Sequence, residues 1–129
     1  SRDWSSDVCS SDLSPDGTKT ITTSRDGTAR VWSLQGTLLA TLNGHTDWVL
    51  SASFSPDGTK IVTASGDATA RVWDLQGNRI ATLAGHTLWV RSASFNPDGS
   101  KIVTASVDKT ARIWELTFFL ESENEGTQP

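Results

Sequence analysis

Apolar and polar positions along this chain repeat in strict register. The run Lys-Ile-Val-Thr-Ala-Ser at 60–65, rich in β-branched and small residues, returns unchanged at 101–106, and the step from 60 to 101 defines one repeat. The run follows Ser-Pro-Asp-Gly at 55–58, which predicts a hairpin turn because proline presets φ and Asp-Gly accepts a tight reversal. A period in the forties indicates one supersecondary unit that is copied and stacked.

One copy, residues 44–84, predicts four short antiparallel strands joined by turns. The expected strands are 48–54, 60–65, 69–74 and 79–83. Runs such as Val-Thr-Ala-Ser at 62–65 are small or β-branched on both faces, which fits a sheet that is covered on both sides. Four such strands in each repeat correspond to one blade of a propeller.

Several short motifs recur through the copies with small changes. They are Gly-His at 44–45, Ser-Pro-Asp-Gly at 55–58, Ser-Gly-Asp at 65–67 and Trp-Asp at 73–74. These motifs resemble the WD40 repeat family from residue 14 to about 116, and the spacer after Trp-Asp looks like that of repetitive bacterial, especially cyanobacterial, members. The resemblance implies an all-β fold, a partial WD40 β-propeller of about three four-stranded antiparallel blades. We expect the first blade to be incomplete and the blades to form an open arc unless the chain oligomerises.

The same period divides the chain into segments. Residues 1–13 fail the period, and 3–13 resemble a common short-read sequencing adapter translated in one frame. We therefore expect residues 1–13 to be an artefact, with a divergent first strand as the alternative. The chain contains no methionine, so we also expect it to be a fragment. The remaining segments are an incomplete repeat, a full repeat, a repeat without its regular outer strand and a tail expected to be disordered, at 14–43, 44–84, 85–116 and 117–129.

Composition and charge argue against several classes of function. The formal net charge of −4 disfavours a nucleic-acid partner, since phosphate binding needs a basic face. No apolar run approaches the roughly 18 residues that a membrane span needs, and no signal peptide is evident. The single cysteine, Cys9, excludes an intrachain disulfide and favours a cytoplasmic location. The two histidines stand one repeat apart and cannot assemble a metal site, and no phosphate loop is present, so we expect no metal or cofactor.

Serine, histidine, aspartate and tryptophan recur together as a set. A Ser-His-Asp combination would suggest a hydrolase triad, but the set is copied once per repeat and lacks a nucleophile elbow, so we expect no enzyme. The resemblance implies instead a hydrogen-bond network in which histidine links the Asp turn to serine and then to the indole N–H. Trp4 stands where the first copy needs the histidine, so its blade should be the softest. The network residues are His45, Ser65, Asp67 and Trp73, and then His86, Ser106, Asp108 and Trp114.

Differences between the two best copies point to a binding surface. Residues 44–75 and 85–116 agree at 24 of 32 positions, and the radical differences flank the Gly-His loop and the Asp turn. By resemblance both lie towards the narrower top face, where family members bind partners; neutral drift in exposed loops is the alternative. Exposed aromatic and arginine side chains are common anchors of interfaces. The candidate partner-binding residues are Asp47, Trp48, Leu50, Gly66, Ala68, Leu88, Trp89, Arg91, Val107 and Lys109.

These features favour a non-enzymatic scaffold that binds a partner protein or peptide on its top face, with no nucleic-acid or membrane partner. Self-association that completes a ring would cover the two end blades. The alternative is the C-terminal sensor or ligand-recognition module of a larger bacterial STAND NTPase, kinase or protease signalling protein. A fold by itself does not choose between these functions, whereas a nucleotide-binding motif upstream in the full reading frame would.

Overall fold

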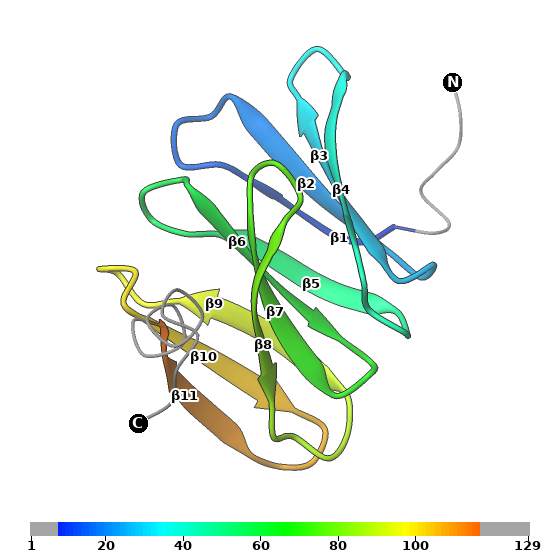
Figure 1. Cartoon of the computed structure of the whole chain (residues 1–129), viewed down its shortest axis with the longest axis vertical. Helices are drawn as coiled ribbons and strands as arrows, with labels where there is room; N and C mark the ends of the chain where they lie inside the picture. The colour runs from blue at the N-terminus through cyan, green and yellow to red at the C-terminus, as the bar shows by residue number, and fades with distance from the viewer. Residues whose placement is uncertain (1–7, 117–129) are drawn as a thin grey trace.

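The computed structural model describes the backbone of residues 8–116 and the side chains of residues 11–116. This part of the chain forms three antiparallel sheets of four, four and three strands, which follow one another along the long axis of the molecule (Figure 1). The first sheet contains β1 (Val8–Leu13), β2 (Lys19–Ser24), β3 (Thr28–Ser33) and β4 (Leu38–Asn43). The second contains β5 (Val49–Phe54), β6 (Lys60–Ser65), β7 (Thr69–Asp74) and β8 (Arg79–Ala84). The third contains β9 (Val90–Phe95), β10 (Lys101–Ser106) and β11 (Ala111–Glu115).

The sheets confirm the all-β, partial-propeller prediction. Strands within each sheet pair in chain order, as successive hairpins, and the three sheets do not close into a ring. In the second copy β6 and β7 have the expected bounds, while β5 begins one residue later than predicted and β8 ends one residue later. Turn chemistry and β-branched runs therefore predicted the strands well.

The turn between β5 and β6 shows why these hairpins form. Gly58 has φ +76°, a left-handed conformation that glycine adopts without strain, and its N–H donates to the Ser55 carbonyl at 2.9 Å. The Asp57 carboxylate accepts the Ser55 hydroxyl at 2.7 Å and the Thr59 N–H at 3.0 Å. The turn thus satisfies its own polar groups, and the same motif recurs before β2 and β10.

The first sheet differs from the sequence expectation, which left the first blade incomplete. In the structure β1 pairs with β2, and Leu13 lies opposite Thr20 in the register that Phe54 and Ile61 adopt in the second sheet. Strand pairing uses backbone groups that almost any sequence supplies, so a segment with unrelated side chains can still complete a sheet edge. The proposed artefact origin of residues 1–13 stays a prediction. The expected disordered tail, 117–129, lies outside the described residues.

Two apolar layers hold the sheets together. Ile21, Val31 and Leu42 of the first sheet pack on Ile61 and other residues of the second. The positions one repeat further on, Val62, Val72 and Leu83, pack in the same way on the third sheet. Because the second sheet is covered on both faces, five of the six residues of β6 are buried, which accounts for the missing alternation in its sequence.

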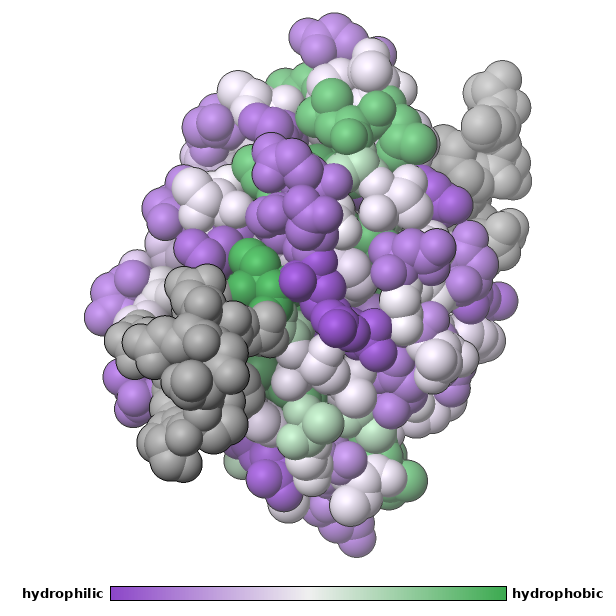
Figure 2. All heavy atoms as spheres, in the orientation of Figure 1, coloured by the Kyte–Doolittle hydropathy of each residue, from purple (hydrophilic) through white to green (hydrophobic). Residues whose placement is uncertain are grey.

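The two end sheets each keep one face uncovered among the described residues. On the third sheet Val103 and Ile113 are 40% and 68% exposed, and on the first sheet Leu13 is 60% exposed. Apolar atoms are also exposed over the β3–β4 hairpin, within a mainly hydrophilic surface (Figure 2). Leu38 belongs to this hairpin and is 47% exposed. None of the described residues forms a helix long and apolar enough to cross a membrane.

Candidate functional site

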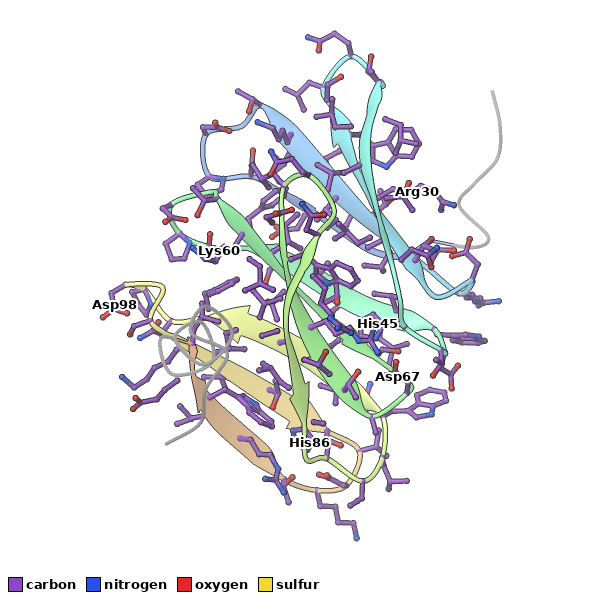
Figure 3. All side chains as sticks on the ribbon, viewed as in Figure 1. Arg30, His45, Lys60, Asp67, His86 and Asp98 are labelled. Atoms are coloured by element: carbon purple, nitrogen blue, oxygen red, sulfur yellow. The ribbon has the colours of Figure 1, made fainter. Side chains whose placement is uncertain are left out.

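A buried chain of hydrogen bonds runs through the top of the second sheet. His45, in the loop before β5, places Nδ1 2.9 Å from Asp67 Oδ2, in the β6–β7 turn, and Nε2 2.7 Å from Thr63 Oγ1, in β6. The Trp73 indole N–H, from β7, donates to the same Thr63 oxygen at 2.9 Å. His45 and Asp67 lie close together in Figure 3. The network therefore joins the loop, the turn and two strands.

Thr63 occupies the place that the sequence analysis gave to Ser65. Ser65 Oγ instead accepts the Asp67 N–H at 3.1 Å and donates to the Asp47 carbonyl at 3.3 Å. Both side chains point to the same face, because residues two apart on a strand do so, but only Thr63 is level with the indole. The missed signal is a threonine that recurs at positions 22, 63 and 104, each two residues before the serine.

The third sheet repeats this network almost atom for atom. His86 lies 2.9 Å from Asp108 Oδ2 and 2.7 Å from Thr104 Oγ1, which also accepts the Trp114 indole N–H at 2.9 Å. Ser106 donates to the backbone carbonyls before β9 rather than to the histidine.

The first sheet has only part of this network among its described residues. Trp32 donates to Thr22 Oγ1 at 3.0 Å, and Asp26 forms an ion pair with Arg30 at 3.6 Å. Trp4, which stands at the histidine position, lies outside the described residues. The prediction that the first blade is the softest therefore stays a prediction.

The hydrogen bonds around His45 accommodate a neutral ring. Nδ1 faces the Asp67 carboxylate and must carry a proton, so a neutral ring accepts the Thr63 hydroxyl at Nε2 while Thr63 accepts from the indole. Burial lowers the pKa of His45, and the Asp67 charge offsets this only in part. Burial alone would raise the pKa of Asp67, but hydrogen bonds from Thr69, His45 and the Thr46 amide outweigh it and lower that pKa to about 2.

These shifts predict that the free energy of unfolding decreases as the pH falls. Below its ordinary pKa of 6.5 His45 is protonated more readily in the unfolded chain than in the folded one. Asp67 adds a second loss, which develops as the pH falls from 3.8 through about 2. Urea unfolding measured at a series of pH values from neutral to acidic should show both losses.

An Asp67→Asn variant provides the control for this pH dependence. Its free energy of unfolding should fall less steeply than that of the wild type below pH 3.8. Part of the decrease should remain, because the pKa of Asp57 is also lowered to about 2. A wild-type protein whose free energy of unfolding stays constant over the acidic range would contradict the assigned protonation states.

The structure brings five of the candidate partner-binding residues together. They line a surface pocket of about 680 Å³. Its wall is apolar apart from one arginine, and its residues come from β5, β9 and the loops at the ends of β9 and β10. The lining residues are Leu50, Leu88, Trp89, Arg91 and Val107.

A row of aromatic and cationic groups extends from this pocket across the neighbouring sheets. The rings of Trp48 and Trp89 have centroids 6.1 Å apart, and the Arg25 guanidinium carbon lies 4.6 Å from the centre of the Trp48 ring. Both tryptophans are partly exposed, at 38% and 44%. Arg25 was missed because only two repeats were compared. Positions 25, 66 and 107 read Arg, Gly and Val, so the first repeat carries the signal.

Asp47 and Gly66 contact each other rather than the pocket. A Cβ at Gly66 would lie 3.2 Å from the Asp47 carboxyl carbon, and Asp47 accepts the Trp48 N–H at 2.7 Å. In the third repeat the same two positions carry Leu88 and Val107, which both line the pocket. The two differences therefore replace the close approach of a carboxylate to a glycine by an apolar wall.

Ala68 and Lys109 adopt a backbone conformation that disfavours side chains. Their φ angles are 73° and 75°, and the equivalent residue of the first repeat, Gly27, has φ 87°. An Ala68→Gly variant should therefore be more stable by about 0.5–1 kcal/mol, because glycine adopts this conformation without a Cβ clash. Urea denaturation of the two proteins measures the difference.

The reverse change, Gly27→Ala, is the matched control for Ala68→Gly. It should destabilise the protein, since the added Cβ would lie 2.9 Å from the His45 carbonyl oxygen. Stability changes of the same sign in both variants would refute the backbone explanation.

Among residues 11–116, no group of three histidine, cysteine or acidic side chains is placed to hold a metal ion. The Ser-His-Asp sets also lack the geometry of a triad, since each histidine contacts a threonine whose hydroxyl is buried against an indole. The absence of metal, cofactor and catalysis stays a prediction.

Comparison with protein-family models matches this chain to WD40, described as "WD domain, G-beta repeat". The matched segments are residues 2–33, 36–74 and 77–115. The first contains β1, β2 and β3, and each of the other two begins with the last strand of one sheet and continues through the first three strands of the next. A search of curated proteins gives no match.

Proposed function

Because the chain belongs to the WD40 repeat family, we propose that it binds a partner protein or peptide through the top face of its blades, without catalysis. WD40 repeats indicate a protein-interaction scaffold, and the domains of this family generally bind proteins or peptides. The observation that carries the proposal is the pocket of about 680 Å³, in which four residues that differ between the repeats and the shared Trp89 come together from two blades. The meeting of several variable residues on one concave surface favours a binding site over scattered drift.

The backbone holds this surface in place before any partner arrives. The Trp48 and Trp89 carbonyls accept the N–H groups of Gly66 and Val107 at 2.8 and 2.9 Å, which fixes each tryptophan loop to the neighbouring turn. This chain would then lose little conformational entropy when a partner binds. Tryptophans are also frequent hot spots of interfaces. The blades act by presenting side chains on a stiff frame.

Charge on the surface favours a partner that combines an apolar side chain with a carboxylate. Arg91 is the charged residue that lines the pocket, and Arg25 lies over the adjoining Trp48. Asp47, the acidic candidate, already accepts the Trp48 N–H. The chain as a whole has a net charge of −4, so the attraction of a partner's carboxylate to this surface would come from these two arginines.

Selection of peptides from a displayed random library on the wild-type chain would test this function. The exchange variant Leu50→Arg/Arg91→Leu keeps the composition but moves the cation to the neighbouring blade. It should bind the selected peptides at least about tenfold more weakly by titration calorimetry, with an unchanged melting temperature. Arg79→Leu, which removes an exposed arginine from β8, should leave the affinity unchanged. Failure to enrich any peptide, or equal affinity for all three proteins, would overturn the proposal.

We also propose a cytoplasmic location, and we keep as the alternative context a ligand-recognition module of a larger bacterial signalling protein. The repetitive spacer after the Trp-Asp motif favours that context. Sequencing the full reading frame tests it, because a sensor module would be preceded by a nucleotide-binding, kinase or protease domain.

A second partner, another copy of the same chain, forms part of this proposal. Val103 and Ile113 at one end of the arc and Leu13 at the other are exposed apolar residues on the flat faces of the sheets. Self-association would remove these side chains from water.

A further inference from the structure

The outer face of the third sheet carries the equivalents of residues that are buried between the second and third sheets. Val62 and Val72 of the second sheet have no exposed surface, because the third sheet covers them. Their equivalents in the next repeat, Val103 and Ile113, are 40% and 68% exposed. Over the two middle strands the side-chain chemistry of this face is the same in the two sheets. Among the described residues, the third sheet lacks a covering sheet and an equivalent of β8, which supplies Leu83 to the buried face.

The outer face of the first sheet is the complementary half of the same interface. Leu13, which is 60% exposed, occupies the position of Phe54, which is 8% exposed and packs on the first sheet. Leu34 is 57% exposed, whereas its equivalent Leu75 packs against the core. The first and third sheets lie at opposite ends of the arc in Figure 1, so these faces cannot meet within one chain.

We propose that two copies of this chain associate head to tail, so that the third sheet of each copy covers the first sheet of the other and closes a six-bladed ring. This inference rests on the proposed self-association and is independent of peptide binding. Within the chain β1 and β2 pack on β5, and β5 and β6 pack on β9. The same rule places β9 and β10 of one copy against β1 of the next.

Stoichiometry follows from the number of blades. Propellers close with about four to eight blades, so two copies of a three-bladed chain fit this range and three copies exceed it. Two identical heterologous contacts related by a two-fold axis complete the ring and leave no further face to extend it.

One hydrogen bond identifies the register of the contact. Ser53 Oγ donates to the Ala93 carbonyl at 3.2 Å, from the second sheet to the third. The equivalent donor at the open end is Ser94, and the equivalent acceptor is the carbonyl of Ser11 in the second copy. Thr20 replaces Ile61 on the receiving face, so this contact buries less apolar surface than the internal ones and should be weaker.

Sedimentation of the full chain across the micromolar range would test the ring. The mass should rise from one to two copies of the 13.9 kDa chain and then stay constant. Ile113→Arg and Leu13→Arg each damage one exposed face, so each variant alone should remain monomeric with an unchanged far-ultraviolet spectrum. Leu38→Arg, a matched change at an exposed leucine whose equivalent in β8 is Arg79, should still dimerise.

Mixing the two monomeric variants separates this arrangement from a symmetric face-to-face dimer. The mixture contains one undamaged pair of faces, so association should return, whereas a face-to-face contact would be lost in only one of the two variants. A monomer at all concentrations, a dimer that survives both changes, or growth beyond two copies would overturn the proposal. Peptide binding by the monomeric variants would show that the top-face function stands independently.

Discussion

Replacing Trp73 with alanine is expected to lower the free energy of unfolding by about 3–5 kcal/mol, the usual cost of removing a buried large aromatic side chain. Trp73 is 1% exposed and packs in the layer between the first and second sheets. Its ring lies edge-on to His45 with centroids 6.2 Å apart, and its N–H donates to Thr63. The loss combines a cavity with broken polar contacts and approaches the total stability of many small domains. Urea denaturation followed by circular dichroism measures it without relying on tryptophan fluorescence.

Trp32→Ala provides the matched comparison for Trp73→Ala. Trp32 occupies the same position of the first repeat, but it is only partly buried, on the sheet face that no other described sheet covers. Its removal should therefore cost clearly less than that of Trp73. Equal costs at both positions would show that burial between sheets is not what makes Trp73 important.

A Thr63→Val variant should lose about 2–4 kcal/mol even though valine has nearly the same shape. The hydroxyl accepts the Trp73 indole N–H and lies 2.7 Å from His45 Nε2, and Thr63 has no exposed surface. Valine leaves His45 Nε2 and Trp73 Nε1 buried without the Thr63 partner. Each buried polar atom that lacks a hydrogen bond lowers the free energy of unfolding. Urea unfolding of the variant and the wild type would measure the difference.

Two further variants isolate the hydroxyl group. Thr63→Ser restores an oxygen at the same place and should recover most of the loss. In the first sheet Thr22 accepts the Trp32 indole N–H, and no histidine contact to it is described, so Thr22→Val should cost less than Thr63→Val. A serine variant as unstable as the valine variant would refute the role assigned to the hydroxyl.

The sequence predicted the strands because their determinants are local. Turns such as that at Gly58 contain the residues that satisfy them, and the intervening runs have one strong conformational preference. The sequence predicted Ser65 as the partner of the histidine and the indole, but the structure has Thr63 there, because local sequence does not determine which hydroxyl lies next to the indole. Both lie on one face of β6, and only the pairing register, with Thr63 opposite Arg71 and Ile61 opposite Trp73, decides which hydroxyl is level with the indole.

The candidate surface was predictable in its members but not in its shape. Comparing repeats identified Leu50 and Arg91 as variable, but their meeting in one pocket depends on how neighbouring sheets pack. Arg25 required the first repeat, and its stacking on Trp48 depends on a contact between sheets. Comparison of the repeats did not identify β1, because its side chains differ from those of the other copies and backbone pairing with β2 holds it.

The repetition of one sheet-to-sheet contact also bears on how such a gene can change in length. Because the residues at 21 and 62 play the same part in successive sheets, a duplicated or deleted repeat would meet matching neighbours on both sides. The product of such a change would need no compensating substitutions in the core. Selection could then act on blade number separately from the residues of the top face.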